Sequence, residues 1–315
     1  MTTQIAFLFP GQGSQSVGMG RDLAERFPVA AETFAEADEA CGFALSRLCF
    51  EGPDEDLKLT ENTQPAILTV SVAAWRVLAA HGVEPSLAAG HSLGEWSAHV
   101  AAGTLNFADA VRAVKARGNA MQQAVPAEEG AMAAVLALDA AQVAEACAEA
   151  AAETGLTVAA ANLNSPGQTV ISGALAAVQK AIGITKAKGA RRAMMLPVSA
   201  PFHCALMKPA QEEVARVLAS FELTDPRIPV AANVTGELVT TAEAARDALI
   251  RQVTGTVRWV ECMQTLIAAG AGAFVEVGPG KVLGGLLRQI DPAQKSFNVE
   301  DVASLEKTLA ELQTI

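Results

Sequence analysis

The chain has little of what membrane proteins and nucleic-acid-binding proteins need. Its 315 residues contain no stretch of about 18 uninterrupted apolar residues, which argues against a membrane span. Acidic residues outnumber basic ones by 34 to 23, and the net charge of −11 argues against nonspecific binding to nucleic acid or to an anionic lipid surface. No basic segment precedes the strand predicted at 5–9, so we expect no signal peptide.

Cysteine and histidine are also scarce. The five cysteines are odd in number, scattered, and never spaced as Cys-x-x-Cys. We therefore expect neither a disulfide framework nor a zinc site, and we expect a cytoplasmic location. Only four histidines are present, which narrows the search for a catalytic base to His81, His91, His99 and His203.

Short apolar runs alternate with amphipathic helices along most of the chain. This alternation is typical of an α/β protein with a largely parallel sheet. The strands predicted for this sheet lie at 5–9, 87–90, 230–234 and 273–277, and we expect the run at 273–277 to be the last strand. The length exceeds that of most single domains, so one large domain with an insertion, or two domains, is expected.

The middle of the chain has a different pattern. Residues 128–198 predict a strand, a helix, two strands joined by the turn at 164–167, a second helix and a last strand. This βαββαβ order is that of a ferredoxin-like unit. We therefore predict a small inserted subdomain at 128–198, within a catalytic domain formed by residues 1–127 and 199–315.

The most informative motif is a serine between two glycines, in the segment Gly90-His91-Ser92-Leu93-Gly94. It follows an apolar run and precedes a predicted helix. A strand that becomes a helix within one or two residues forces the turning residue into a sparsely populated backbone conformation, which presents its side chain. The helix N-terminus would also offer N–H groups to an oxyanion. This geometry suits a nucleophilic serine, although an ordinary Gly-Ser turn remains an alternative.

A serine hydroxyl needs a base to accept its proton. We favour His203, which we place at the start of a helix 111 positions after Ser92, with a helix-capping role as the alternative. The other histidines fit less well: His81 is expected to cap a helix, His91 to point away from the serine, and His99 to lie too far along the helix. No acidic residue between Ser92 and His203 stands alone at a strand end, which counts against an ordinary hydrolase.

Arg117 is the second informative charge. It lies in a predicted helix, near Met121 and next to Gly118. A guanidinium on the inner side of an apolar helix is costly unless it is paired, and its fork suits a carboxylate bound through two hydrogen bonds. The alternative is a solvated arginine, which we expect Arg112 to be.

Six motifs occur in a fixed order over nearly the whole chain. They are Phe9-Pro10-Gly11-Gln12-Gly13-Ser14-Gln15, Gly90-His91-Ser92-Leu93-Gly94-Glu95, Arg117-Gly118-x-x-Met121-Gln122, Asn164-Ser165-Pro166-Gly167-Gln168, Phe202-His203 and Glu276-Val277-Gly278-Pro279-Gly280. Together they resemble the malonyl-CoA:acyl-carrier-protein transacylases of bacterial fatty acid synthesis. The resemblance implies an α/β-hydrolase-like core with a ferredoxin-like subdomain.

The resemblance also implies roles at the reacting centre. Ser92 would be the nucleophile and His203 the general base. The backbone N–H groups of Gln12 and Leu93 would form the oxyanion hole, and Arg117 would bind the malonyl carboxylate.

Two further positions carry roles through the same resemblance. The main-chain carbonyl of Gln252 would orient the histidine in place of an acid, and Phe202 would fill the space that an α-methyl group needs. A neutral carbonyl fixes the imidazole tautomer but stabilises an imidazolium less than a carboxylate does.

The implied enzyme is an acyl-carrier-protein S-malonyltransferase that supplies fatty acid elongation. It would move the malonyl group from malonyl-CoA to the phosphopantetheine thiol of acyl carrier protein through a malonyl-serine intermediate, with no cofactor or metal. We expect a monomer. A serine thioesterase or hydrolase, a non-catalytic carrier-binding module and a stand-alone polyketide acyltransferase are the alternatives.

Acyl carrier proteins are acidic, so docking on an acidic enzyme needs a local excess of positive charge. Such a cluster occurs at the end of the predicted subdomain, in Lys186, Lys188, Arg191 and Arg192. We predict that this cluster attracts the carrier, with a solvated basic turn as the alternative.

Overall fold

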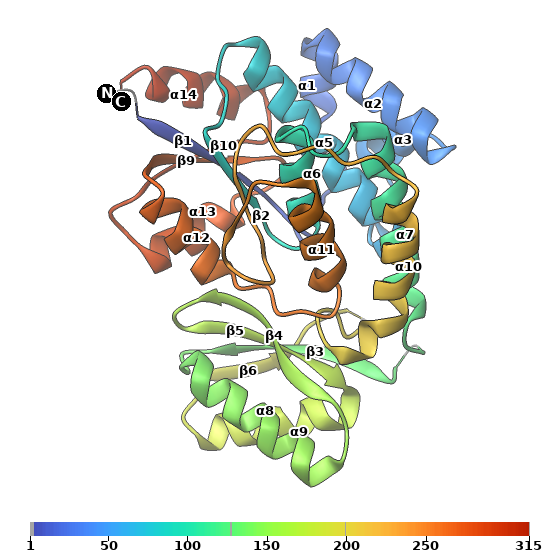
Figure 1. Cartoon of the computed structure of the whole chain (residues 1–315), viewed down its shortest axis with the longest axis vertical. Helices are drawn as coiled ribbons and strands as arrows, with labels where there is room; N and C mark the ends of the chain where they lie inside the picture. Colours follow the sequence, from blue (N-terminus) through green and yellow to red (C-terminus); the bar gives the residue numbers. More distant parts are fainter. Residues whose placement is uncertain (1–2, 127, 199, 315) are drawn as a thin grey trace.

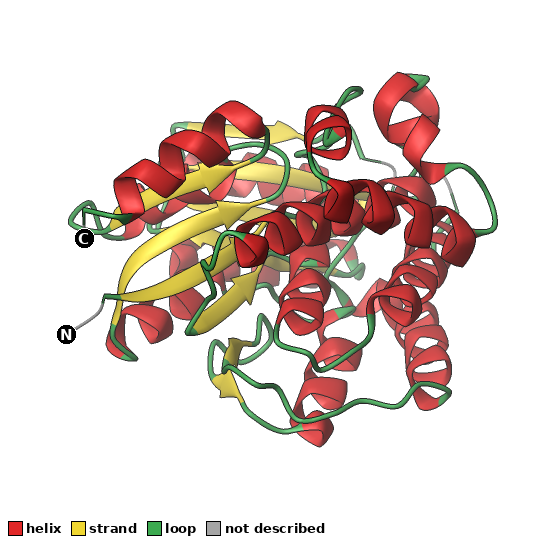
Figure 2. Cartoon of the chain, turned by 90° about the horizontal axis from the view of Figure 1, so that it is seen from above, coloured by secondary structure: helices red, strands yellow, loops and turns green. Residues whose placement is uncertain are grey.

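Two sheets organise the molecule. The computed structural model describes residues 3–126, 128–198 and 200–314. The larger sheet, with helices on both of its faces (Figure 2), forms the upper part of Figure 1, and the smaller sheet lies below it. The described ends of the chain lie close together at the edge of the larger part (Figure 1).

The larger sheet is parallel except at one edge, as predicted. Its strands run in the order β10-β9-β1-β2-β7-β8, and only the pair β7–β8 is antiparallel. The bounds are β1 Gln4–Phe9, β2 Leu87–Gly90, β7 Val230–Ala231, β8 Leu238–Val239, β9 Ala271–Val277 and β10 Lys295–Val299.

Most helices belong to the larger part. They are α1 Arg21–Arg26, α2 Pro28–Cys41, α3 Leu45–Glu51, α4 Asp54–Leu57, α5 Thr60–Ala80, α6 Leu93–Ala101, α7 Phe107–Gln123, α10 Lys208–Ala219, α11 Ala242–Gln252, α12 Trp259–Ala268, α13 Val282–Ile290 and α14 Val302–Leu312. Among the described residues, no helix is long and apolar enough to span a bilayer.

Strand β1 shows why both faces of the large sheet are covered. Successive side chains of a strand point to opposite faces. Phe7 and Phe9 are buried in a core shared with α2, α5, α6 and α7, while Ala6 and Leu8 are buried in a second core with α12 and α13. An apolar residue at every position is what a doubly covered parallel strand requires.

The smaller sheet is antiparallel, with strand order β4-β5-β3-β6. Its elements are β3 Gly130–Leu136, α8 Ala140–Thr154, β4 Val158–Ser165, β5 Gln168–Ala174, α9 Leu175–Ala187 and β6 Arg192–Met195. Helices α8 and α9 cover the face turned away from the larger part (Figure 1). This confirms the ferredoxin-like βαββαβ order.

The division of the chain into two domains stays a prediction. Its limits fall on or next to residues 1, 127, 199 and 315, which lie outside the described residues. Main-chain hydrogen bonds do join β4 to the segment before α12: Leu163 donates to the carbonyl oxygen of Val257 at 2.9 Å, and Val257 donates to that of Ala161 at 2.8 Å.

The prediction that 273–277 is the last strand is wrong. Strand β10 follows it and pairs in parallel with β9, at the edge of the sheet. Because it is an edge strand, only Phe297 and Val299 of its five residues are apolar, and no apolar run marks it in the sequence.

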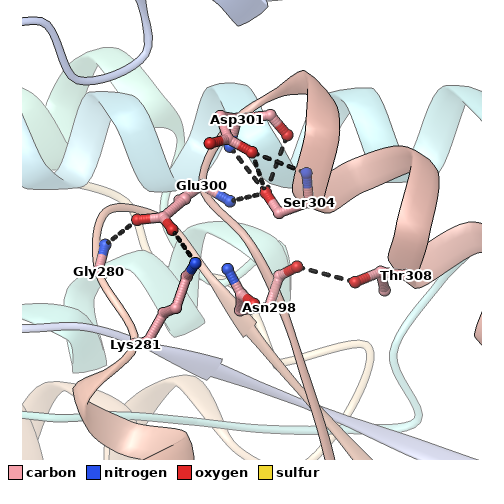
Figure 3. Close-up of polar contacts among 7 residues, drawn as sticks. All are labelled: Gly280, Lys281, Asn298, Glu300, Asp301, Ser304 and Thr308. Atoms are coloured by element: carbon pink, nitrogen blue, oxygen red, sulfur yellow. Dashed lines mark hydrogen bonds and ion pairs between the residues drawn. The ribbon is translucent and has the colours of Figure 1, made fainter.

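The turn between β10 and α14 fastens a glycine loop (Figure 3). Glu300 accepts the backbone N–H of Gly280 at 3.0 Å and pairs with the ammonium of Lys281 at 2.8 Å. Asp301 caps α14 by accepting the backbone N–H of Ser304 at 2.7 Å, within a capping box. The loop is thus fixed by both the sheet edge and the helix end.

The structure also corrects the placement of Phe202 and His203. They lie in a turn, followed by a 3-10 helix at Ala205–Met207, and α10 begins only at Lys208. The reason is local: His203 has a positive φ of 60°, which is incompatible with a helix, and Pro209 suits the first turn of α10.

Candidate active site

Ser92 occupies a sharp turn between β2 and α6, with φ 52° and ψ −104°. Positive φ is strained for a residue with a Cβ. The flanking glycines are required by close packing. A Cβ on Gly90 would lie 1.9 Å from the main chain of Gly94, and a Cβ on Gly94 would lie 2.0 Å from the carbonyl oxygen of Phe9.

The turn brings the serine to His203. Ser92 Oγ lies 2.7 Å from His203 Nε2, and His203 Nδ1 lies 2.9 Å from the main-chain oxygen of Gln252, the last residue of α11. A carbonyl oxygen can only accept, so Nδ1 carries the proton and Nε2 is free to accept the serine proton. The three positions named by the resemblance therefore meet in space.

The surroundings of His203 favour its neutral form. The imidazole is buried, and burial followed by the positive charge of Arg117 lowers the pKa of His203 from 6.5 to about 3. A lowered histidine pKa means that the ring binds its second proton only at acidic pH. At neutral pH the ring is then neutral, with its proton on Nδ1 and Nε2 free to accept another.

This environment predicts a histidine that does not titrate near neutrality. In a nitrogen-15 NMR titration we expect the His203 signals, identified by their loss in His203→Ala, to keep the neutral pattern between about pH 8 and pH 5. A protonation midpoint near the ordinary value of 6.5 would contradict the described burial.

Arg117 extends from α7 to Ser92 Oγ, the oxygen that also contacts His203. Its side chain is only 1% exposed. Nη1 donates to Gln64 Oε1 at 2.7 Å, while Nη2 donates to Gln252 Oε1 at 2.9 Å and to Ser92 Oγ at 3.1 Å. Burial lowers the pKa of Arg117 to about 10, so the guanidinium remains charged at neutral pH. The alternative of a solvated arginine is wrong for this residue, whereas Arg112 is exposed and pairs with Asp109.

A backbone N–H at the start of α6 lies next to the serine. Leu93 is the first residue of α6, where the N–H groups have no partner inside the helix. The N–H of Ser92 itself is already used, because it donates to Asn233 Oδ1 at 2.7 Å. Leu93 is therefore the better placed of the two to bind an oxyanion.

The loop that contains Gln12 is held beside the serine turn. A Cβ on Gly11 would lie 2.4 Å from the carbonyl oxygen of His91, so the two segments touch. Ser14 Oγ donates to the Gly11 carbonyl oxygen at 2.8 Å, and the loop borders a cavity of about 200 Å³. The cavity is lined by Pro10, Gly11, Gln12, Gly13, Ser14, His91, Asn164, Gln168, Val282, Leu283 and Leu286.

The other histidines serve the fold. His81 Nδ1 lies 2.8 Å from the carbonyl oxygen of Val77 at the end of α5, as expected of a capping residue. His91 Nε2 lies 2.8 Å from Asn164 Oδ1, which links the serine turn to the small sheet. His99 is buried at 3.2 Å from Thr104 Oγ1.

The remaining predicted positions are Phe202 and the four basic residues of the predicted docking cluster. Phe202 precedes His203 and packs in the main core. The four basic residues of the predicted docking cluster are exposed on and after α9 and on β6, and Lys188 pairs with Glu149 at 3.5 Å.

Comparison with known proteins agrees with the motifs. Residues 6–308 match the model of the acyl transferase domain. The malonyl CoA-acyl carrier protein transacylase of Salmonella typhimurium is 49% identical over 98% of this chain and 100% of its own length, and that of Bacillus subtilis is 46% identical over 99% and 98%. The chain belongs to this transacylase family.

Solved structures of the family share the fold. An acyl carrier protein S-malonyltransferase from Vibrio cholerae superposes with a TM-score of 0.94 at 50% identity, over 97% of this chain and 100% of its own. A malonyl-transacylase solved in complex with a holo type II PKS acyl-carrier protein superposes with a TM-score of 0.95 at 47% identity, over 98% and 100%.

Three polar side chains of the site were not predicted to act there: Gln64, Glu95 and Asn233. Gln64 lies near the N-terminal end of α5 and binds Arg117. Asn233 belongs to a predicted strand at 230–234 that in fact ends at Ala231. Leaving the sheet frees Asn233 to donate from Nδ2 to the carbonyl oxygen of Gly90 at 2.8 Å and to accept the Ser92 N–H. In the sequence, the available signal for this role was a polar residue, Asn233, near the end of the apolar run at 230–234.

Proposed function

We propose that this chain transfers a malonyl group from malonyl-CoA to the phosphopantetheine thiol of acyl carrier protein, through an ester on Ser92. One observation carries the proposal. The Ser92 hydroxyl lies 2.7 Å from an imidazole nitrogen of His203 and 3.1 Å from the buried guanidinium of Arg117. A nucleophile, a base and a carboxylate-binding group thus converge on one oxygen.

The first half-reaction forms the ester. His203 Nε2 accepts the hydroxyl proton as Ser92 Oγ attacks the thioester carbonyl carbon, and the N–H groups of Leu93 and Gln12 hold the oxyanion. The carbon–sulfur bond then breaks, and the imidazolium gives its proton to the departing thiolate of CoA. The main-chain oxygen of Gln252 keeps the ring oriented throughout, since it binds Nδ1–H in both protonation states.

The second half-reaction uses the same groups in reverse. The thiol of the carrier's phosphopantetheine gives its proton to His203 and attacks the malonyl-serine carbonyl. The carbon–oxygen bond breaks, and the proton returns from His203 to Ser92 Oγ. Protons balance over the cycle, so no cofactor or metal is needed.

Arg117 gives the site its choice of acyl group. A buried guanidinium can form two hydrogen bonds to the free malonyl carboxylate, whereas an acetyl group would leave it facing an apolar methyl. Phe202, which precedes His203 and packs in the main core, would fill the space that an α-methyl group needs.

Transfer is better supported than hydrolysis. The relatives are named transacylases, and one neighbour's structure is a complex with an acyl carrier protein.

We also propose that the protein is a monomer and that it lies in the cytoplasm, because its scattered cysteines suit reducing conditions.

The proposal is tested by mixing the enzyme with labelled malonyl-CoA in the presence and absence of holo acyl carrier protein. We expect label on the carrier when it is present, and slow malonate release when it is absent. Rapid release of malonate without the carrier would favour a thioesterase instead. Failure to label either the enzyme or the carrier would favour a non-catalytic carrier-binding module.

The four exposed basic residues are our proposed docking site for the acidic carrier. Reversing two charges in Lys188→Glu/Arg192→Glu should raise the KM for the carrier, because association of charged partners is steered electrostatically. Acylation by malonyl-CoA should be unaffected, and the effect should shrink in high salt. An unchanged KM for the carrier would remove the docking role.

A further inference from the structure

One buried carboxylate next to the reacting centre has no part in the mechanism above. Glu95 lies on the first turn of α6, three residues after Ser92, and is fully buried. Its Oε2 accepts from Gln252 Nε2 at 2.6 Å and from the backbone N–H of Asn233 at 3.1 Å. Burying a charge is expensive unless it is hydrogen-bonded or paired, so the position calls for an explanation.

The side chain of Gln252 connects this carboxylate to Arg117. Its Nε2 donates to Glu95 and, at 2.9 Å, to the carbonyl oxygen of Ser92, while its Oε1 accepts from Arg117 Nη2 at 2.9 Å. A carboxylate accepts and a guanidinium donates, so the amide has only one workable orientation between them. The three side chains form a chain from negative to positive charge with one amide in the middle.

The pKa shifts of Glu95 and Arg117 also indicate that the two side chains interact. Burial raises the pKa of Glu95 to about 7, and the charge of Arg117 opposes that rise. In turn, Glu95 opposes the lowering of the Arg117 pKa. The guanidinium therefore has an electrostatic partner without a direct ion pair, and among the described residues no carboxylate takes the place of a substrate carboxylate on it.

We propose that Glu95 is a positioning residue that holds Arg117 in place for the malonyl carboxylate through the Gln252 side chain. The inference rests on the proposed function, because it assigns Glu95 to acyl selection. His203 is held by the main-chain oxygen of Gln252, so the base does not depend on this link.

The test compares acylation of Ser92 by malonyl-CoA and by acetyl-CoA in Glu95→Met and Glu95→Gln. Glu95→Met removes both charge and acceptor, and we expect the malonyl-to-acetyl rate ratio to fall by about tenfold or more, as for a lost hydrogen bond to a charged group. Glu95→Gln keeps an acceptor oxygen for Gln252, so its ratio should lie between those of Glu95→Met and the wild type. A merely structural role would lower both rates together.

Glu276 offers a matched control. It is also a buried glutamate with a pKa raised by burial to about 7, but its oxygens accept from the backbone N–H groups of Leu283 and Gly284 at 3.0 and 2.8 Å. Glu276→Met should lower thermal stability and leave the rate ratio unchanged. A fall in this ratio equal to that of Glu95→Met would contradict the proposal.

If Glu95→Met does not fold, the connection between Glu95 and Arg117 is tested by replacing Gln252, which lies between them. Gln252→Met keeps the main-chain oxygen that binds His203 and removes the amide. It should show the same selective loss for malonyl-CoA, and adding Glu95→Gln to it should cost nothing more. A wild-type ratio in Gln252→Met, or additive losses in the double variant, would overturn the inference. If the wild type itself forms no malonyl adduct, the proposed function fails instead.

Discussion

His203→Ala is expected to slow acylation of Ser92 by about 10²–10⁴-fold, the usual contribution of a positioned general base. The imidazole nitrogen lies 2.7 Å from the serine oxygen, and its other nitrogen is anchored on a main-chain carbonyl. Without it, no neighbouring group among the described residues is placed to accept the hydroxyl proton, since Arg117 can only donate.

The rate is measured by quenched-flow labelling with radioactive malonyl-CoA. His81→Ala is the matched control, because it removes a histidine from the end of α5 that makes a local contact with Val77. It should acylate at the wild-type rate. An equal loss in the two variants would show that the effect of His203→Ala is not specific to the base.

Arg117→Ala is expected to lower the rate of acylation by malonyl-CoA by about 10²-fold, which is within the cost of removing one partner of a buried charged pair. Acetyl-CoA has no free carboxylate for Arg117 to bind, so the rate of acylation by acetyl-CoA should fall much less. Selection for malonyl-CoA would therefore largely disappear.

Arg112→Ala is the control for this second variant. Arg112 lies on the same helix, but it is exposed and pairs with Asp109 at 3.0 Å. Its removal should change neither rate. Retention of malonyl selection in Arg117→Ala would place the carboxylate-binding group elsewhere.

Much of the fold could be predicted because its signals are local. Strand β2, the Ser92 turn and α6 follow one another within a few residues, and the glycines at 90 and 94 mark how closely helix and strand pack. The βαββαβ order of the small sheet is likewise contiguous in sequence. Strand β10 was missed because an edge strand needs only partial burial.

Ser92, His203 and Arg117 could be singled out from the residues themselves, but joining them to the Gln252 carbonyl in one reacting centre needed the family resemblance. Ser92 and His203 are 111 positions apart, and the Gln252 oxygen that binds His203 belongs to the main chain, which has no residue-type signal. The positive φ of His203 also escaped prediction, so the residue was placed on a helix.

The buried polar residues behind the serine were harder still. Glu95 and Asn233 are 138 positions apart and meet through a single backbone hydrogen bond of 3.1 Å. Nothing in a glutamate after a glycine distinguishes a buried acceptor from a solvated first-turn acid, which is the commoner situation in helices. Only three-dimensional packing reveals that this one is buried.

In the proposed reaction Ser92 carries the malonyl group, and intact-protein mass spectrometry after brief mixing with malonyl-CoA tests this most directly. We expect a single malonyl adduct on the wild-type chain that maps to Ser92, is lost on adding holo acyl carrier protein, and does not form in Ser92→Ala. An adduct of the same mass on Ser92→Ala, or none on the wild type, would contradict the account.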